Sequence, residues 1–245
     1  MNAVLYISRN GLLEPLGQSQ ILPYLRKIGR NYKVILITYE KSEDWADTKG
    51  VANAFEICKK NNIFWKPKRF RPRMFQSTSG VTFMCDMIFT AAREVWKNDC
   101  KLVHARSYIP CIAALAVNRS LGTPFVFDMR ALLPEELISS GRLKKDGLPE
   151  KFLRYSERLC LANSSVVVSL TNAAAAHLRL IYPKEVKNKK IAVIPTCVDL
   201  DKFSFTGSRI ASKKKVYGCI GTLLSGWFKV DWLSSWIETV LSNDP

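Results

Sequence analysis

The chain has 245 residues, of which 47% are hydrophobic and 24% are charged, so it can bury a substantial core and is not a disordered chain. No apolar run approaches the roughly 20 residues that a membrane-spanning helix needs, and residues 1–4 lack the pattern of a secretory signal peptide. The formal net charge of +16 indicates an anionic partner or surface. We therefore expect a cytoplasmic protein that is soluble or peripheral at the inner face of the cell membrane.

The cysteines and histidines argue against a disulfide framework and against a metal site. The seven cysteines are odd in number, widely spaced and free of Cys-x-x-Cys pairs, which is typical of buried thiols in a reducing compartment. There are only two histidines, His104 and His177. We expect no bound metal.

Strand-like and helix-like segments alternate along the chain. Candidate strands rich in Val, Ile and Leu occupy residues 4–8, 33–38, 63–65, 102–105, 125–128, 165–169, 191–194 and 216–220. Candidate helices occupy residues 18–28, 45–61, 82–96, 110–120, 151–162, 172–181 and 230–241. This alternation predicts an α/β fold with a Rossmann-like, doubly wound and mostly parallel sheet.

The loop between the first strand and the first helix, residues 8–20, reads SRNGLLEPLGQSQ. Open α/β sheets bind ligands at the carboxyl ends of their strands, which is where this loop lies. Gly11 and Gly17 allow a ligand to approach the backbone closely, and the following helix offers free N–H groups to an anion. The loop matches neither a dinucleotide-binding fingerprint nor a Walker P-loop.

Residues 66–75 carry five basic side chains and no acidic one. The interleaved apolar residues are Phe64, Trp65, Phe70, Met74 and Phe75. Basic and aromatic residues together suit a membrane interface or an anionic acceptor. The same composition would suit single-stranded nucleic acid or a solvated loop. The chain shows no nucleic-acid-binding motif, so we expect no nucleic-acid partner. The basic residues assigned to this contact are Lys66, Lys68, Arg69, Arg71 and Arg73.

Polar side chains end two candidate strands. His104 and Arg106 end one, and Asp128 and Arg130 end the next, with Glu135 in the following loop. An imidazole can bond a sugar hydroxyl, and a guanidinium can meet a phosphate or carboxylate as a planar fork. His104 could equally be a buried, satisfied histidine, and Asp128 and Arg130 could form a structural ion pair.

A domain boundary is expected close to residues 205–215, which read as a polar linker. The strand pattern restarts at residue 216, but the remaining 30 or so residues are too few to bury a core of their own. We therefore expect one complete domain over 1–204, a linker over 205–215 and the truncated start of a second domain over 216–245.

Three motifs carry a resemblance to a known family. They are the loop NG…EPLGQSQ, the segment IPTCVDLDKF at residues 194–203, and GTL…GWFKVD at residues 221–231. Together they resemble family 4 glycosyltransferases of the GT-B fold, in which two Rossmann-like domains face each other across a cleft. The resemblance implies an N-terminal, acceptor-side domain and an incomplete second Rossmann-like domain. Many relatives have Asn-Gly at Thr196-Cys197, and the family's paired-glutamate motif does not occur in this sequence.

The resemblance implies transfer of a sugar from a nucleotide sugar to a glycan or glycolipid acceptor, with retention of configuration and without metal or cofactor. A cell-envelope polysaccharide or lipid-linked acceptor fits the charge. The implied catalytic residues are His104 and Asp128; the implied donor-binding residues are Asn10, Gly11, Gly17, Gly221 and Lys229; and the implied acceptor-binding residues are Glu14, Arg106, Arg130 and Glu135.

Two other functions fit the same sequence. The chain could be a catalytically inactive module from a shortened gene that binds anions or membranes. A GT-B epimerase acting on nucleotide sugars is a third reading, which the EPLGQSQ loop disfavours. The sequence does not decide whether the 245-residue chain alone turns over substrate, because the paired-glutamate motif is missing.

Overall fold

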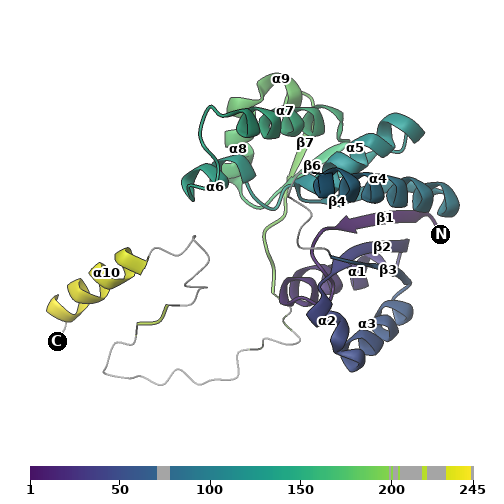
Figure 1. Cartoon of the computed structure of the whole chain (residues 1–245), viewed down its shortest axis with the longest axis horizontal. Coiled ribbons are helices and arrows are strands. Elements are labelled where there is room, and N and C mark those ends of the chain that lie inside the picture. Colours follow the sequence, from purple (N-terminus) through teal and green to yellow (C-terminus); the bar gives the residue numbers. More distant parts are fainter. Residues whose placement is uncertain (71–77, 199, 201–203, 205–216, 220–229, 244–245) are drawn as a thin grey trace.

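The computed structural model describes residues 1–70, 78–198, 200, 204, 217–219 and 230–243. Its core is a seven-stranded sheet in the order β3-β2-β1-β4-β5-β6-β7, and every pair of neighbouring strands is parallel (Figure 1). The strands are β1 (Ala3–Ser8), β2 (Lys33–Glu40), β3 (Ile63–Arg69), β4 (Cys100–Arg106), β5 (Phe125–Asp128), β6 (Val166–Ser169) and β7 (Lys190–Val193). The predicted α/β, Rossmann-like fold is confirmed.

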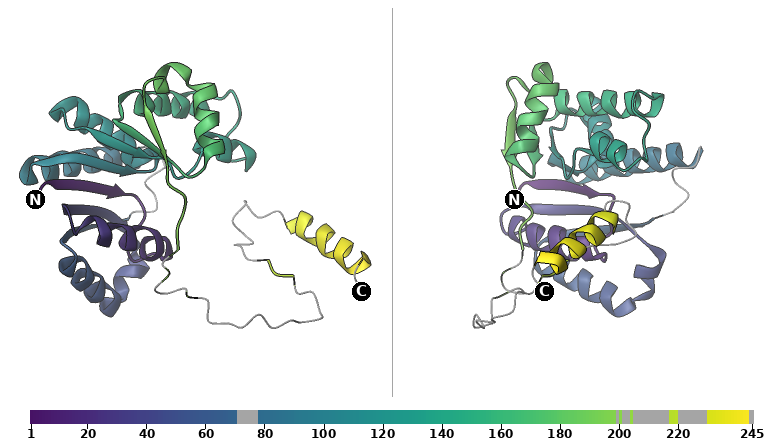
Figure 2. Two further views of the ribbon diagram at one scale, coloured as in Figure 1. Left: turned by 180° about the vertical axis from the view of Figure 1, so that it is seen from behind. Right: turned by 90° about the vertical axis from the view of Figure 1, so that its left-hand side faces the viewer.

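Helices cover both faces of the sheet. One face carries a π-helical turn, η1 (Gly17–Ile21), with α1 (Leu22–Ile28), α2 (Ser42–Ala46) and α3 (Thr48–Lys60); the opposite face carries α4 (Thr78–Asn98), α5 (Tyr108–Leu121), α7 (Leu148–Asn163), α8 (Asn172–Ile181) and α9 (Pro183–Val186) (Figures 1 and 2). The short α6 (Leu133–Ser139) connects β5 to α7. The described helices end with α10 (Val230–Asn243), close to the predicted helix 230–241.

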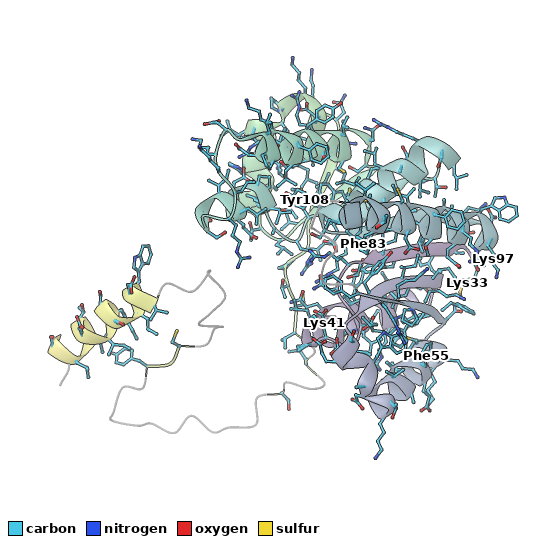
Figure 3. All side chains as sticks on the ribbon, in the orientation of Figure 1. Lys33, Lys41, Phe55, Phe83, Lys97 and Tyr108 are labelled. Carbon is cyan, nitrogen blue, oxygen red and sulfur yellow. The ribbon has the colours of Figure 1, made fainter. Side chains whose placement is uncertain are left out.

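Two hydrophobic clusters, one on each face, hold these layers together. Along β1, Leu5 and Ile7 belong to the cluster beneath α4 and α5, whereas Tyr6 belongs to the cluster beneath α1 and α3. This alternation follows from the period of two in a strand, and burial on both faces explains the continuous apolar runs in the sequence. Figure 3 shows Phe83 and Tyr108 on the first side of the sheet and Phe55 on the other.

The structure differs from the sequence-based expectation at several elements. The predicted helix 45–61 is two helices, α2 and α3, because Asp47 interrupts it and its side chain caps α3 by accepting a 3.0 Å hydrogen bond from the Gly50 N–H. Neither α6 nor α9 was predicted. Residues 217–219, from the predicted strand 216–220, do not form a strand, and residues 216 and 220 lie outside the described part of the chain, as does the predicted linker 205–215.

The strand order shows at which edge of the sheet a ligand is expected to bind. From β1 the chain moves to β2 and β3 on one side, and then returns to β4 on the other side of β1. The carboxyl ends of β1 and β4 therefore flank the point where the winding direction reverses, which is where open α/β sheets bind ligands. The residues that follow β1, β4 and β5 meet at this edge.

Candidate functional site

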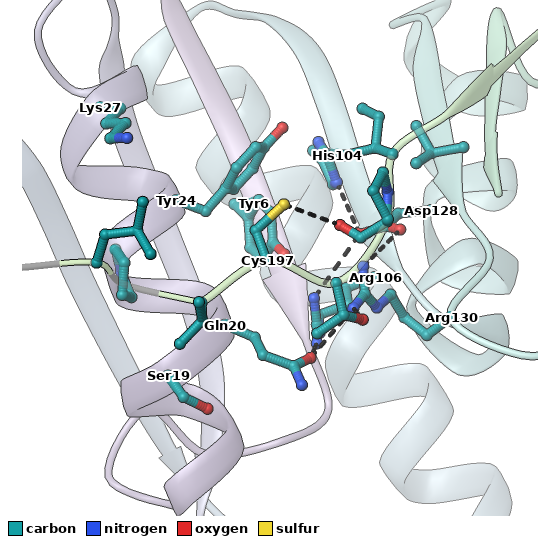
Figure 4. A pocket seen from close by; sticks show the side chains of 17 residues that line it. Tyr6, Ser19, Gln20, Tyr24, Lys27, His104, Arg106, Asp128, Arg130 and Cys197 are labelled. Atoms are coloured by element: carbon teal, nitrogen blue, oxygen red, sulfur yellow. Dashed lines mark hydrogen bonds and ion pairs between the residues drawn. The ribbon is translucent and has the colours of Figure 1, made fainter. Parts of the chain in front are cut away.

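A cavity of about 520 Å³ opens at the carboxyl edge of the sheet (Figure 4). It lies between the ends of β1, β4, β5 and β6, the first helix of the chain and the segment that follows β7. The lining residues are Tyr6, Ser19, Gln20, Pro23, Tyr24, Lys27, His104, Arg106, Asp128, Arg130, Val168, Ile194, Pro195, Thr196, Cys197, Val198 and Leu200. Four predicted site residues, His104, Arg106, Asp128 and Arg130, are brought together here.

An aromatic wall forms one side of the cavity around His104. Tyr6 is the register partner of His104 on the neighbouring strand. The two rings stack with centroids 4.5 Å apart, and Tyr24 meets His104 edge-on at 5.8 Å. Tyr6 is buried, whereas Tyr24 is exposed at the cavity. The apolar faces of sugar rings pack well on such walls, which present π-faces together with polar edges.

Asp128 is the anionic centre of the cavity. Its Oδ2 lies 3.2 Å from Nε2 of His104. Burial alone would raise the pKa of Asp128, but the hydrogen bond from His104 and the charges of His104, Arg130 and Arg106 outweigh burial and lower that pKa. Asp128 is therefore ionised at neutral pH, so Nε2 of His104 carries the hydrogen that joins them, and the carboxylate fixes the orientation of the imidazole.

Two arginines share this single carboxylate. Nη1 of Arg130 lies 3.7 Å from Asp128 Oδ1, and Nη1 of Arg106 lies 3.9 Å from Oδ2. Both distances are long for charge-assisted hydrogen bonds. Both guanidinium groups instead donate to Oε1 of Gln20, Arg106 at 2.7 Å and Arg130 at 3.1 Å. Burial, and then the charge of Arg106, lower the pKa of Arg130. The cavity thus holds more positive charge than Asp128 neutralises.

The backbone is strained beside this cluster. Ser107, which follows Arg106, has φ 72° and ψ −178°, a conformation that side-chain-bearing residues rarely adopt. The Ser107 N–H donates to the Asp128 carbonyl at 2.9 Å, and the Ser107 carbonyl accepts from the Cys111 N–H at 3.1 Å. These bonds fix the turn from β4 to α5, and they therefore also fix the backbone from which the Arg106 side chain extends.

The glycine-containing part of the loop, residues 8–17, lies beside the cavity and does not line it, whereas Ser19 and Gln20 at its end do. Glu40, fully buried at the end of β2, accepts hydrogen bonds from the N–H groups of Leu12 (2.8 Å) and Leu13 (3.1 Å). A Cβ on Gly11 would lie 2.5 Å from Glu40 Oε2, and a Cβ on Gly17 would lie 2.2 Å from the Gly11 carbonyl oxygen. A side chain at either position would therefore collide with the loop or with Glu40, so close packing alone explains why both residues are glycine.

Asn10 and Glu14 bond to each other within this loop. The Asn10 side-chain amide and the Gly11 N–H each donate to a Glu14 carboxylate oxygen at 3.4 Å, and Lys41 lies 3.7 Å from the same side chain. The loop also ties to the first helix, because the Gln18 amide donates to the Leu12 carbonyl at 2.8 Å. These contacts make the loop a rigid unit that positions the turn before Gln20.

Other predicted residues lie away from the cavity. Glu135 forms an ion pair with Arg154 at 2.9 Å and lies 3.6 Å from His177. Lys66 and Arg69 are exposed on the edge strand β3, and Lys68 lies 3.8 Å from Asp86. The aromatic rings of this segment do not share one surface: Phe64 is exposed, Trp65 is buried and donates to Thr38 at 2.7 Å, and Phe70 packs against the core. Arg71, Arg73, Gly221 and Lys229 lie outside the described residues.

Sequence reasoning missed several lining residues. Gln20, Tyr24 and Lys27 lie on one face of the first helix at helical spacing, opposite the buried residues Ile21, Leu22 and Leu25. That polar face was visible in the sequence. Tyr6 could have been found from the strand alternation, because it lies on the same face of the sheet as its register partner His104.

Among the described helices, none is long and apolar enough to cross a membrane. Within the same part of the chain, no group of three or more His, Cys, Asp or Glu side chains converges as a metal site would require.

Comparisons with known proteins agree with this fold. The sequence model described as Glycosyltransferase Family 4 matches residues 20–202. Sucrose-phosphate synthase from Thermosynechococcus elongatus superposes with a TM-score of 0.56 and 14% identity, over 83% of this chain and 50% of that one. A glycosyltransferase from Rickettsia africae superposes with a TM-score of 0.51 and 16% identity, over 83% and 45%. The chain thus spans about half the length of these structures. No protein of curated function matches its sequence.

Proposed function

The chain belongs to glycosyltransferase family 4, and from this premise we propose that it forms one half of the active site of an enzyme that transfers a sugar from a nucleotide sugar to an acceptor. The observation that carries the proposal is the cavity at the switch point of the sheet, where an oriented histidine and two arginines converge. The other half of the cleft would be a nucleotide-binding domain that begins after the linker 205–215. This division of the chain is part of the proposal.

His104 and Asp128 would orient the sugar. Because Nε2 is bonded to Asp128, the remaining nitrogen of His104 would form a hydrogen bond with a sugar hydroxyl, which can both donate and accept. The sugar ring would pack on Tyr24, which lies edge-on to His104 at the exposed side of the cavity. This pair of contacts fixes both the hydroxyl direction and the plane of the ring, and such positioning lowers the activation barrier to transfer.

Arg106 and Arg130 would bind an acidic group of the substrate. The charge that Asp128 leaves uncompensated favours a phosphate or carboxylate, and two guanidinium forks can grip its oxygens with fixed geometry. If the group is the departing diphosphate, the arginines stabilise the negative charge that develops as the glycosidic bond to the nucleotide breaks. If it belongs to the acceptor, they select an acidic acceptor.

The finer features of the reaction are also proposals. Retention of configuration follows the resemblance to the family. The arginine pair supplies fixed positive charge, so the proposed mechanism calls for neither a metal nor a cofactor. A cell-envelope glycan or glycolipid acceptor, and a location at the cytoplasmic face of a membrane, suit a chain with a net charge of +16.

The test is an assay of sugar transfer and sugar-nucleotide hydrolysis with a panel of UDP- and GDP-sugars. The 245-residue chain is assayed alone and then mixed with the nucleotide-binding half of a full-length family 4 enzyme. Turnover only in the mixture supports the proposal. Turnover by the chain alone would show that it holds a complete donor site, and absence of turnover in both would favour a binding module without transferase activity.

A further inference from the structure

An exposed apolar stripe runs along the outer face of α7. Leu148, Phe152 and Tyr155 are spaced at four and three residues, so they lie on one face of the helix, and they are 82%, 69% and 60% exposed. The opposite face is buried, since Cys160 and Leu161 belong to the core. Large side chains do not gain by facing water, and a row of three marks a surface that contacts something else.

Basic residues surround this stripe. Between residues 140 and 158 the exposed charged side chains are Asp146 and five basic ones, namely Arg142, Lys144, Lys145, Lys151 and Arg158. Lys151 lies on the stripe itself, one residue before Phe152. Of the described carboxylates, none forms an ion pair with Lys144, Lys145 or Lys151, although the pKa of Glu150, which the hydrogen bond from Arg154 lowers most, is lowered further by the charge of Lys145. Exposed apolar side chains surrounded by lysines are typical of a surface that binds an anionic lipid bilayer.

The first turn of α7 lies toward the same edge of the sheet as the cavity. α7 ends close to the start of β5, because the Ser165 N–H that follows it donates to the Phe125 carbonyl at 2.8 Å. The helix has 16 residues, so its first turn lies roughly 24 Å away, in the direction of the carboxyl ends of the strands (Figure 1). Leu148 and the basic loop before it are thus on the cavity side of the molecule.

Other surfaces fit a membrane less well. On α4, Val81, Phe89 and Trp96 are also exposed, but the exposed charges on that helix from residue 80 onward are Asp86, Arg93 and Lys97. The C-terminal turn of α4, with Trp96, leads into the amino end of β4, opposite the cavity. On β3, Trp65 faces the core, so Phe64 is the single exposed ring of that strand beside Lys66 and Arg69, in place of the row of three on α7.

We propose that the α7 stripe (Leu148, Lys151, Phe152 and Tyr155), together with Lys144 and Lys145, docks the protein onto an anionic lipid bilayer. The apolar side chains insert at the level of the headgroups, and the lysines contact anionic headgroups. The orientation that results turns the carboxyl edge of the sheet toward the membrane. This inference concerns a surface outside the cavity and holds whether or not the chain transfers sugar.

The test is cosedimentation of the full chain with vesicles of equal parts phosphatidylglycerol and phosphatidylcholine, and with vesicles of phosphatidylcholine alone. We expect binding to the anionic vesicles that weakens at high salt. The variant Leu148→Ser with Phe152→Ser should bind about tenfold or more weakly, and Lys144→Glu with Lys145→Glu should lower binding by at least fivefold for each residue changed. The matched control, Phe89→Ser with Trp96→Ser on α4, removes equally exposed rings and should bind as the parent chain does.

Each of three results would overturn the proposal. The first is no binding to anionic vesicles. The second is loss of binding in the α4 control, or on substitution of Lys66, Lys68 and Arg69, with binding by the α7 variants unchanged. The third is concentration-dependent self-association that Phe152→Ser abolishes, which would make the stripe an interface between two copies. Thermal unfolding of every variant checks that these exposed substitutions leave the fold intact.

Discussion

Arg106 and Arg130 direct their guanidinium groups at one atom, the Oε1 of Gln20, at 2.7 and 3.1 Å. Two like charges converge there on a neutral acceptor, although the carboxylate of Asp128 lies within 4 Å of both. The amide of Gln20 takes the place that an anionic oxygen would fill more favourably. In the proposed function, an anionic group of the substrate would displace this amide from the two guanidinium groups.

Replacing either arginine by lysine should weaken anion binding. Arg106→Lys and Arg130→Lys keep the charge but lose the two-pronged hydrogen bonding, so we expect the dissociation constant for inorganic pyrophosphate to rise about tenfold or more. Isothermal titration calorimetry measures this. Arg158→Lys, whose partner Glu185 lies outside the cavity, is the control. Equal binding by all three variants would place the anion elsewhere.

Chemical labelling of the cysteines can test where an anion binds. Cys85, Cys197 and Cys219 are exposed, and of these only Cys197 lines the cavity; burial raises the pKa of Cys58 to about 12 and, as the main cause, that of Cys100 to about 11. A thiol-specific reagent should label the three exposed cysteines quickly and the buried thiols slowly. Pyrophosphate should slow the labelling of Cys197 alone, as read by mass spectrometry of peptides. Equal protection of Cys85 would contradict the assignment.

Gly17 should tolerate no side chain. The Cβ of Gly17→Ala would lie 2.2 Å from the Gly11 carbonyl oxygen and 2.5 Å from that of Leu12, and both are backbone atoms that cannot move without opening the loop. We expect the free energy of unfolding to fall by about 1–3 kcal/mol, as measured by urea denaturation. Gly218→Ala is the control, since a Cβ there meets nothing within 4 Å. An unchanged unfolding curve for Gly17→Ala would show that the loop is not packed as described.

Glu40 should make stability depend on pH. Glu40→Gln leaves the Leu12 or Leu13 N–H without its acceptor, at a cost of about 1–3 kcal/mol. Burial raises the pKa of Glu40 above its ordinary value of 4.5, so the folded chain holds this proton more tightly than the unfolded chain. The stability from Glu40 is therefore complete below pH 4.5 and declines as the pH rises through the folded pKa.

The readout is the difference in unfolding free energy between the parent chain and Glu40→Gln, followed upward from pH 4.5. This difference should shrink as the pH rises, because only the parent carries the titrating group. Glu56→Gln is the control, since Glu56 is exposed on α3 and pairs with Lys60. A gap that widens with pH would mean that the loop stabilises the Glu40 carboxylate more than burial penalises it.

The sequence was sufficient for the parallel sheet and for the core of the site. Strands of Val, Ile and Leu predicted burial on both faces, and parallel strands bring their carboxyl ends to one edge, so His104, Arg106, Asp128 and Arg130 had to meet. The position of the loop and the family resemblance together assigned Asn10, Gly11 and Gly17 to a donor site. The structure places them in a packed loop beside the cavity, and donor binding there stays a prediction.

What the sequence could not provide is contact between distant segments. Glu40 lies 28 residues beyond Leu12, and no local pattern shows that a carboxylate ending an apolar strand would turn inward to hold a loop. The basic and aromatic residues 64–75 were interpreted as one surface, although strand alternation in β3 sends Phe64 outward and Trp65 inward. The exposed row on α7 depends on which face of the helix the sheet covers, which only the folded chain reveals.

The most direct test of the account uses the two histidines of the chain. His104 stacks on Tyr6 in the cavity, whereas His177 lies near Glu135, outside the lining. His104→Ala and His177→Ala are each mixed with the nucleotide-binding half of a family 4 enzyme, and sugar transfer is measured against the parent chain. The account predicts at least a tenfold loss of transfer for His104→Ala and parent-like transfer for His177→Ala. Parent-like transfer by His104→Ala would contradict it.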